Sequence, residues 1–430
     1  MLIRNATLDG RVVDLRLAQG RVTEIGSDLR GEEVLDAVGA TVLPGLVDHH
    51  LHLHALAAAL TSVCLAGLDH TAARTALGAA TPDAHGWIRA TGSADDLDAA
   101  TLDTLHAQRP VRVQHRSGAL WSVNTLGAHL LGLATADHPG IERDPVGAPT
   151  GRLWRADPWL RSRLPATPPD LTPVGALLAS HGITAVTDAT PDLDTLDAGA
   201  LPQHVTALGI GPGSHPPPGV SVGPYKLVLA DGALPDLDEL ANRIDAAHDT
   251  DRAVAVHCVT REALALLLAA LDTVGTRPGD RLEHAAIVPA EAIPLLVKHR
   301  LRVVTQPGFL ADRGHDYRRD VPAADQQDLY RCASLHAAGI PVALSSDAPN
   351  GPLDPWAVID AAVTRRTPDG EALGPAECLD HATALAGYLA PPEDPGGPPR
   401  RITVGCPADL VLRSPGEHTV ATFIAGRRVA

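Results

Sequence analysis

The chain has 430 residues and a formal net charge of −16, and only two of its 35 basic residues are lysines. It has no run of basic residues, so it lacks the phosphate-neutralising surface that nucleic-acid binding requires. No apolar stretch approaches the ~20 residues that cross a bilayer, and the first residues do not resemble an export signal. The five cysteines are widely spaced, which is typical of reduced thiols. We therefore expect a cytoplasmic protein that binds neither nucleic acid nor membrane.

Both ends of the chain are predicted to form short strands separated by turns. The first 42 residues alternate apolar and polar side chains between glycines, and the last thirty do the same in "ADLVLRS" and "VATFIAG". Neither end could bury a core by itself. We expect residues 1–42 and 400–430 to combine into one composite β-sandwich.

The intervening residues 43–399 show a different pattern, in which apolar runs are followed by alanine- and leucine-rich helical stretches. Examples are "ITAVTDAT", "YKLVLADG", "AVAVHCVT", "RLEHAAIV" and "PVALSSDA". Runs that are apolar on both faces and alternate with helices indicate parallel strands covered by helices. This part of the chain is therefore predicted to be of the α/β class.

The spacing of polar residues at the ends of these runs sharpens the prediction. One strand-helix unit takes ~30 residues, and the intervals from Lys226 to His257, to His284 and to Asp347 are 31, 27 and 63 residues. The last interval fits two units. We predict a (β/α)8 TIM-type barrel in which these residues end strands 4, 5, 6 and 8.

A large insertion is predicted early in the barrel. His52 and Lys226 are 174 residues apart, whereas three units need only ~90. The surplus falls at about residues 60–175. Insertions on the catalytic face of a barrel commonly form lids and specificity surfaces.

The segment "PGLVDHHLHLH" is the strongest local signal for a metal site. Alternate side chains of a strand share a face, so His50 and His52 can bind one ion together. His257 and His284 would supply a second pair of nitrogen ligands, and Asp347 ends the last strand. The alternatives are histidines that only form hydrogen bonds and an aspartate that serves a turn. Because active sites lie at the carboxyl ends of barrel strands, we favour the metal site.

Lys226 stands out because the chain otherwise uses arginine almost throughout. Two metal ions ~3.5–4 Å apart need anionic bridges, and four histidines with one aspartate supply little charge. A neutral lysine amine can add carbon dioxide and become a bridging carbamate, which arginine is too basic to do. The alternative is a cation paired with Asp231. We predict two divalent ions, zinc being the ion expected among zinc, manganese and iron, and a carbamate on Lys226.

The order of these motifs resembles the amidohydrolase superfamily, and within it the family 3 branch that includes N-substituted formamide deformylases. The resemblance runs through "PGLVDHHLH", "GIERDPVGAPTGRL", "GITAVTDA", "KLVLADG", "RLEHAAIV", "TQPGFL" and "VALSSDAPNGPLDPW" to the closing "ITVGCPADLVL". It implies a metal-dependent barrel with a flanking β-sandwich. It also implies that His50 and His52 hold the more buried ion, that His257 and His284 hold the other, that carbamylated Lys226 bridges them and that Asp347 completes the first site.

The predicted activity is hydrolysis of a C–N bond in an amide, formamide or cyclic amide by a hydroxide that bridges the two ions. Asp347 would be the catalytic residue, accepting the hydroxide proton and passing it to the departing nitrogen. The expected partner is a small-molecule substrate. Side chains expected to contact it are Arg116, which could bind a carboxylate, Trp121 as an apolar wall, Tyr225 and Gln306.

Two other functions remain open from the sequence. One is a mononuclear metal deaminase or lyase on the same barrel, in which Lys226 stays an amine. The other is a barrel without activity that serves as a binding protein. The presence of six candidate metal ligands in the expected order argues against this alternative. The sequence leaves open the substrate, the native metal and the oligomeric state, including a homodimer.

Overall fold

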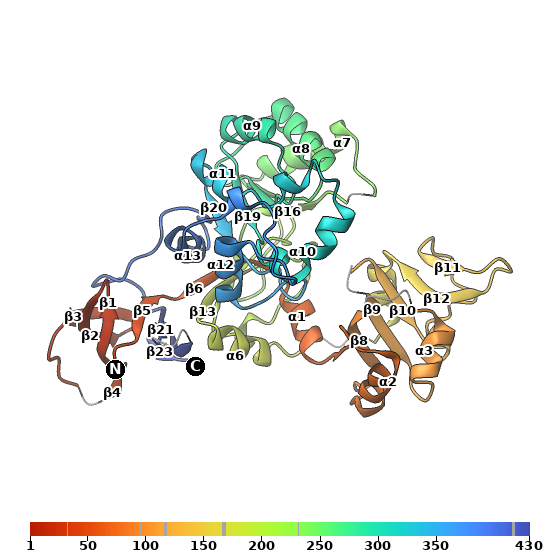
Figure 1. Cartoon of the computed structure of the whole chain (residues 1–430), viewed down its shortest axis with the longest axis horizontal. Coiled ribbons are helices and arrows are strands. Elements are labelled where there is room, and N and C mark those ends of the chain that lie inside the picture. Colours follow the sequence, from red (N-terminus) through yellow and green to blue (C-terminus); the bar gives the residue numbers. More distant parts are fainter. Residues whose placement is uncertain (32, 94–96, 116–117, 166–168, 231, 415–417) are drawn as a thin grey trace. The chain divides into compact units, whose positions relative to one another are not determined.

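The computed structural model describes residues 1–430 except 32, 94–96, 116–117, 166–168, 231 and 415–417 (Figure 1). The chain divides into two compact units. The first combines Met1–Leu53 with Leu171–Ala430, and the second is His54–Asp170. Each unit is described by itself.

Strands from both chain ends share one mixed sheet of the first unit, in the order β23-β22-β21-β5-β1-β2-β3, with β4 also paired to β1. The antiparallel pairing of β5 with β21 joins the two ends, for example through Val411 opposite Leu43. The prediction of a two-layered β-sandwich is not confirmed, because these strands form a single sheet. Its strands are β1 (Leu2–Leu8), β2 (Arg11–Ala18), β3 (Arg21–Gly26), β4 (Val34–Asp36), β5 (Thr41–Pro44), β21 (Leu410–Arg413), β22 (Thr419–Ile424) and β23 (Arg427–Arg428).

Local sequence explains this sheet. The hairpin from β1 to β2 turns at Asp9 and Gly10, which both have positive φ, as a two-residue hairpin turn requires. Inward-facing apolar side chains from both chain ends then form one core that includes Leu15, Leu410 and Phe423. Neither end could have buried these side chains alone.

The first unit also contains two sheets of parallel strands. One has the order β15-β14-β13-β6 and the other β16-β17-β18-β19-β20. Each strand is parallel to its neighbours within its sheet. The strands are β6 (Leu46–Leu51), β13 (Ile183–Asp188), β14 (His204–Ala207), β15 (Val220–Val222), β16 (Tyr225–Val228), β17 (Val254–Cys258), β18 (Arg281–His284), β19 (Arg302–Thr305) and β20 (Val342–Leu344).

The parallel strands do not form one continuous closed barrel, which corrects that part of the prediction. At the two junctions between the sheets, isolated backbone hydrogen bonds take the place of a continuous ladder. At one junction the amide of Lys226 donates to the carbonyl of Leu208 at 3.0 Å. At the other, the amide of Asp347 donates to the carbonyl of His50 at 2.8 Å, and the amide of His52 donates to that of Ala348 at 2.9 Å. At the second junction Asp347 lies beyond the end of β20 and has a positive φ of 53°, so the regular ladder ends before it. Strand order from β16 to β20 nevertheless follows the predicted order of the polar residues.

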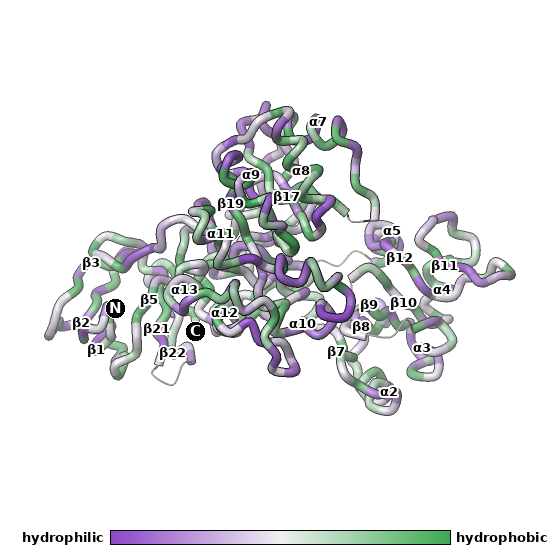
Figure 2. Tube along the Cα trace, turned by 45° about the horizontal axis from the view of Figure 1, so that its top comes forward, coloured by the Kyte–Doolittle hydropathy of each residue, from purple (hydrophilic) through white to green (hydrophobic). Residues whose placement is uncertain are grey.

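Several of the helices that follow these strands bury apolar residues in a shared core. In α8, the buried face repeats at helical spacing through Ala263, Leu264, Leu267 and Leu271. Figure 2 colours most of this helix as hydrophobic. The helices of the first unit are α6 (Thr172–Ser180), α7 (Leu237–His248), α8 (Arg261–Val274), α9 (Ile293–Lys298), α10 (Gly308–Asp320), α11 (Cys332–Ala337), α12 (Pro355–Thr364) and α13 (His381–Leu389). Short 3-10 helices are η1 (Ala198–Ala200), η2 (Ala290–Ala292), η3 (Gln326–Asp328) and η4 (Pro375–Glu377).

The second unit overlaps the segment at about 60–175 that we expect to be inserted. Its sheet has the order β11-β12-β10-β9-β8-β7, parallel from β7 to β9 and antiparallel beyond. The elements are α1 (Leu53–Leu60), which begins in the first unit, β7 (Val63–Cys64), α2 (His70–Ala79), β8 (Ile88–Ser93), α3 (Ala99–Leu105), β9 (Val111–His115), β10 (Leu120–Val123), α4 (Thr125–Leu131), β11 (Ile141–Arg143), β12 (Pro149–Trp154) and α5 (Asp157–Arg163). Among the described residues of both units, no helix has the length and apolar character needed to span a bilayer.

Candidate metal centre

His50 and His52 lie where β6 ends, beside the end of β20. The Nε2 atom of His52 is 3.1 Å from Oδ1 of Asp347, and Nε2 of His50 is 3.6 Å from the same oxygen. The opposite nitrogens of the two rings face other groups, because Nδ1 of His50 contacts Glu283 and Nδ1 of His52 lies 3.3 Å from Oγ1 of Thr190. Both rings thus turn Nε2 towards the same carboxylate.

Asp347 is held in the turn after β20. Its backbone amide donates to His50, and its Oδ1 accepts from Nδ2 of Asn350 at 3.3 Å. Burial by itself raises the pKa of the Asp347 carboxyl, but the hydrogen bond with His52 and the charges of His50 and His52 lower it further than burial raises it. The net effect is a pKa well below the usual range, so this buried group is an anion at neutral pH.

His284 and His257 come from the neighbouring strands β18 and β17. The Nδ1 atom of His284 lies 2.9 Å from Oε1 of Gln306 and 3.9 Å from Oδ2 of Asp347. The His257 and His284 ring centroids are 4.4 Å apart, and those of His50 and His284 are 4.7 Å apart. Burial first, and then the charges of Lys226 and His50, lower the pKa of His257 to about 4. A neutral ring keeps a nitrogen lone pair available for a metal ion.

Lys226 belongs to the same group of buried charges. It lies in β16 and is 5% exposed. Burial is the main cause that lowers its pKa from the ordinary value, while the carboxylates of Glu283 and Asp347 act in the opposite direction. The side chain therefore has more neutral amine than an exposed lysine would have.

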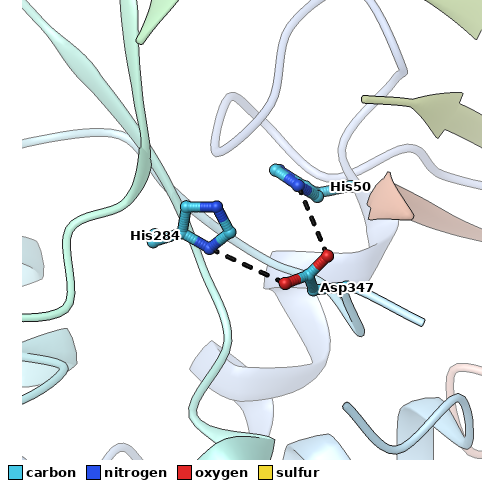
Figure 3. Close-up of side chains that lie close together, drawn as sticks. All are labelled: His50, His284 and Asp347. Carbon is cyan, nitrogen blue, oxygen red and sulfur yellow. Dashed lines mark ion pairs between the residues drawn. The ribbon is translucent and has the colours of Figure 1, made fainter. Parts of the chain in front are cut away.

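Three of these side chains offer ligand atoms that all lie within 4.8 Å of one another: His50, His284 and Asp347 (Figure 3). The Nε2 atom of His50 is buried and has no hydrogen-bond partner among the described residues. Such an unsatisfied nitrogen is costly unless another group completes it. Imidazole nitrogens with one carboxylate are a suitable donor set for a divalent transition metal, so these residues fit a metal ion.

The side chains expected to contact substrate have different surroundings. Gln306 is fully buried, and its amide bridges His284 and Oγ of Ser345. Tyr225 packs against the helix-covered core, with the guanidinium of Arg252 5.5 Å from its ring. That is the outer face of the strand, as simple alternation predicts for the residue before Lys226.

Trp121 belongs to the second unit. Its indole is buried in a core of that unit and donates to Oδ1 of Asp157 at 2.8 Å. Arg116, and Asp231 as the alternative partner of Lys226, lie outside the described residues.

Sequence reasoning missed the pair Arg281 and Glu283 in β18. Both are fully buried, and Nε of Arg281 donates to Oε1 of Glu283 at 2.6 Å. The second oxygen of Glu283 contacts Nδ1 of His50, 233 positions away in sequence. A signal was available in "RLEH", because arginine and glutamate are rarely buried in an apolar strand unless they are paired.

The sequence of this chain matches that of a known protein family. A sequence profile describing the Amidohydrolase family matches residues 33–422. The Bacillus subtilis protein YtcJ, which is named as an amidohydrolase, is 25% identical over 433 residues and covers 83% of this chain and 80% of its own length.

Solved structures show the same fold. An uncharacterised metal-dependent hydrolase from Pyrococcus horikoshii has a TM-score of 0.76 at 20% identity, covering 96% of each chain. Another from Pyrococcus furiosus has a TM-score of 0.72 at 21% identity, covering 96% of this chain and 98% of its own. The fold is thus that of amidohydrolases with a TIM-type α/β arrangement, and the match over most of the sequence shows that the chain belongs to the amidohydrolase family.

Proposed function

We propose that this protein is a metal-dependent hydrolase that cleaves a carbon–nitrogen bond in a small amide, formamide or cyclic amide. The observation that carries the proposal is the convergence of His50, His284 and Asp347, whose ligand atoms lie within 4.8 Å of one another at the carboxyl ends of parallel strands. Membership of the amidohydrolase family supports a hydrolytic reaction.

We assign His50, His52 and Asp347 to one ion, and His257 and His284 to a second. Lys226 would join the two sites as a carbamate, formed when its neutral amine bonds to the carbon of carbon dioxide and releases one proton. The burial that lowers the pKa of Lys226 supports this step, because only the neutral amine reacts. Bound divalent ions lower the pKa of water towards ~7 and polarise a carbonyl oxygen. Zinc is the ion we propose, since imidazole and carboxylate ligands suit it.

Asp347 would move the proton. The carboxyl of Asp347 is an anion at neutral pH, and the anion is the form that can accept a proton from the attacking water. Asn350 and His52 both contact Oδ1 and restrict its rotation. From this position Asp347 would pass the proton to the departing nitrogen, which leaves as a neutral amine.

A mononuclear deaminase or lyase is the second candidate. It is favoured by one observation: within the part of the chain that the structure describes, the converging group of His, Cys, Asp and Glu side chains has three members and includes neither His52 nor His257. In this alternative one ion suffices and Lys226 stays an amine. Metal content separates the two, because the first candidate requires two ions per chain and the second requires one.

The experiment is a screen of the zinc-loaded protein against N-formyl, N-acyl and cyclic amides and ring-amino heterocycles. Release of an amine from an amide, abolished by a chelator and restored by zinc, is the expected result. Release of ammonia from a ring amine without amide cleavage would support the deaminase. Failure to bind any divalent metal would contradict both enzymes and favour a binding protein.

A further inference from the structure

We propose that Glu283, held in place by Arg281, is a positioning residue that fixes the His50 imidazole with its Nε2 atom turned towards the metal position. This inference rests on the proposed function insofar as it assumes a metal at His50. It gives a role to two buried charged residues that neither ligate the ion nor contact the substrate in that mechanism.

Glu283 is engaged at both oxygens. Its side chain is fully buried in β18, where Oε1 accepts from Nε of Arg281 and Oε2 contacts Nδ1 of His50. A carboxylate held from two sides cannot rotate without breaking one of these contacts. Arg281 is itself 2% exposed, and its Nη2 lies 3.5 Å from the carbonyl of His49. The direction of the carboxylate is therefore set by the strand that carries it and by the strand that carries His50.

This contact decides which nitrogen of His50 faces the metal. An ionised carboxylate can only accept hydrogen bonds, so Nδ1 of His50 must carry the proton. Nε2 is then the nitrogen with the lone pair, and it is the atom that is buried without a hydrogen-bond partner in the described residues. The carboxylate also makes the ring a stronger donor to a metal ion.

His50 differs in this respect from the other histidines nearby. Nδ1 of His284 faces the neutral amide of Gln306, and Nδ1 of His52 faces the hydroxyl of Thr190 at the longer distance of 3.3 Å. Neutral partners orient a ring but add little to its basicity. Of these three histidines, His50 is thus the one whose affinity for metal depends most on its neighbour.

A purely structural ion pair between Arg281 and Glu283 is the competing explanation. Burying two charges is expensive, and a buried pair often stabilises a fold no more than apolar residues would. A structural role predicts that neutralising Glu283 changes the unfolding transition and leaves metal affinity unchanged. The positioning role predicts a loss of metal affinity in protein that is still folded.

The test measures zinc affinity of the full-length chain by competition with a chromophoric chelator, after metal removal. Glu283→Gln should weaken zinc binding by about 10- to 100-fold, and Glu283→Asp should recover part of the loss because it restores the charge. Glu262→Gln, on the exposed side of α8, is the matched control and should bind as wild type does. Zinc binding by folded Glu283→Gln within two-fold of wild type would overturn the proposal.

A double-mutant cycle tests whether Arg281 affects zinc binding directly or only through Glu283. Arg281→Met should weaken zinc binding in the wild-type background but add no further loss to Glu283→Gln, because Arg281 acts through the carboxylate. Equal losses in both backgrounds would contradict this. If a variant fails to fold, nitrogen NMR of histidine-labelled wild-type protein still decides, since the zinc-loaded form must show His50 protonated at Nδ1.

Failure of this inference and failure of the proposed function are distinguishable. Amide hydrolysis with unchanged zinc affinity in Glu283→Gln would reject the positioning role alone. Weakened zinc binding without hydrolysis of any amide would reject the proposed substrate class alone.

Discussion

The terminal sheet and the carboxyl ends of the parallel strands bury very different side chains. The terminal core consists of apolar residues such as Leu15, Leu410 and Phe423. In β16, in β18 and in the turn after β20, the buried residues include Lys226, Glu283 and Asp347. Apolar burial stabilises a fold, whereas burying charges costs free energy unless they are paired or bind a metal. The comparison assigns stability to the first region and chemistry to the second, and substitutions can test each assignment.

The largest effect is expected at Asp347. Asp347→Asn keeps an oxygen that can ligate a metal but removes the negative charge that accepts a proton. We expect turnover of the amide identified in the screen to fall by about 100- to 10,000-fold, with zinc retained. Activity and metal content are measured on the same preparation.

Asp380→Asn is the matched control, because Asp380 is an exposed N-cap of α13 and asparagine caps equally well. It should leave turnover unchanged. Wild-type turnover in Asp347→Asn would remove this residue from the proton path.

Lys226 is expected to show the next largest effect, with Lys298 as its control. Lys298 is exposed at the end of α9 and pairs with Asp272, so Lys298→Arg should change nothing. Lys226→Arg cannot form a carbamate and brings a permanent cation to the site. Metal content by mass spectrometry should fall from two ions per chain to at most one. Two ions in Lys226→Arg would refute the bridging carbamate.

The structures of the two regions could be predicted from the sequence to different extents. In the terminal strands, alternation alone indicates which side chains are buried, although it could not show that the strands form one sheet rather than two layers. For the parallel strands, spacing predicts the order of Lys226, His257, His284 and Asp347. Spacing could not reveal that the parallel strands form two sheets instead of one closed barrel. That outcome depends on local backbone geometry, such as the turn at Asp347.

The contacts around His50 show what local patterns leave out. Glu283 reaches His50 only because β6 and β18 meet in the folded chain, and no periodicity links positions so far apart. Gln306 was expected near substrate, yet its environment is decided by a neighbouring strand through Ser345. Strand ends are readable from sequence, whereas the partners of buried polar groups depend on tertiary packing.

In the terminal sheet, Phe423→Ala should lower the free energy of unfolding without changing the catalytic activity of the folded protein. The ring is fully buried in the core formed by both chain ends. Removing such a side chain typically costs about 3–5 kcal/mol of unfolding free energy. Urea unfolding should show the loss, while kcat of the folded variant stays at the wild-type level. Val420→Ala in the same strand is partly exposed and should shift stability by less than about 0.5 kcal/mol. A specific loss of kcat in folded Phe423→Ala would contradict the separation of the two regions.

The smallest effect is expected where the terminal sheet contacts the amino end of a parallel strand, at His204 in β14 and Asp409 before β21. Nε2 of His204 lies 3.1 Å from Oδ2 of Asp409. This hydrogen bond is the main cause that raises the pKa of His204, while burial opposes it. A histidine with a raised pKa stabilises the fold fully below its unfolded value of about 6.5, and the contribution is lost as the pH rises through the folded value. Because the His204 side chain is 58% exposed, solvent screening limits it to less than about 1 kcal/mol. Thermal unfolding of wild type and His204→Ala should therefore differ most near pH 5–6 and converge towards pH 9. A difference that is constant over this range would show that the pair does not stabilise the contact between the terminal sheet and β14 through charge.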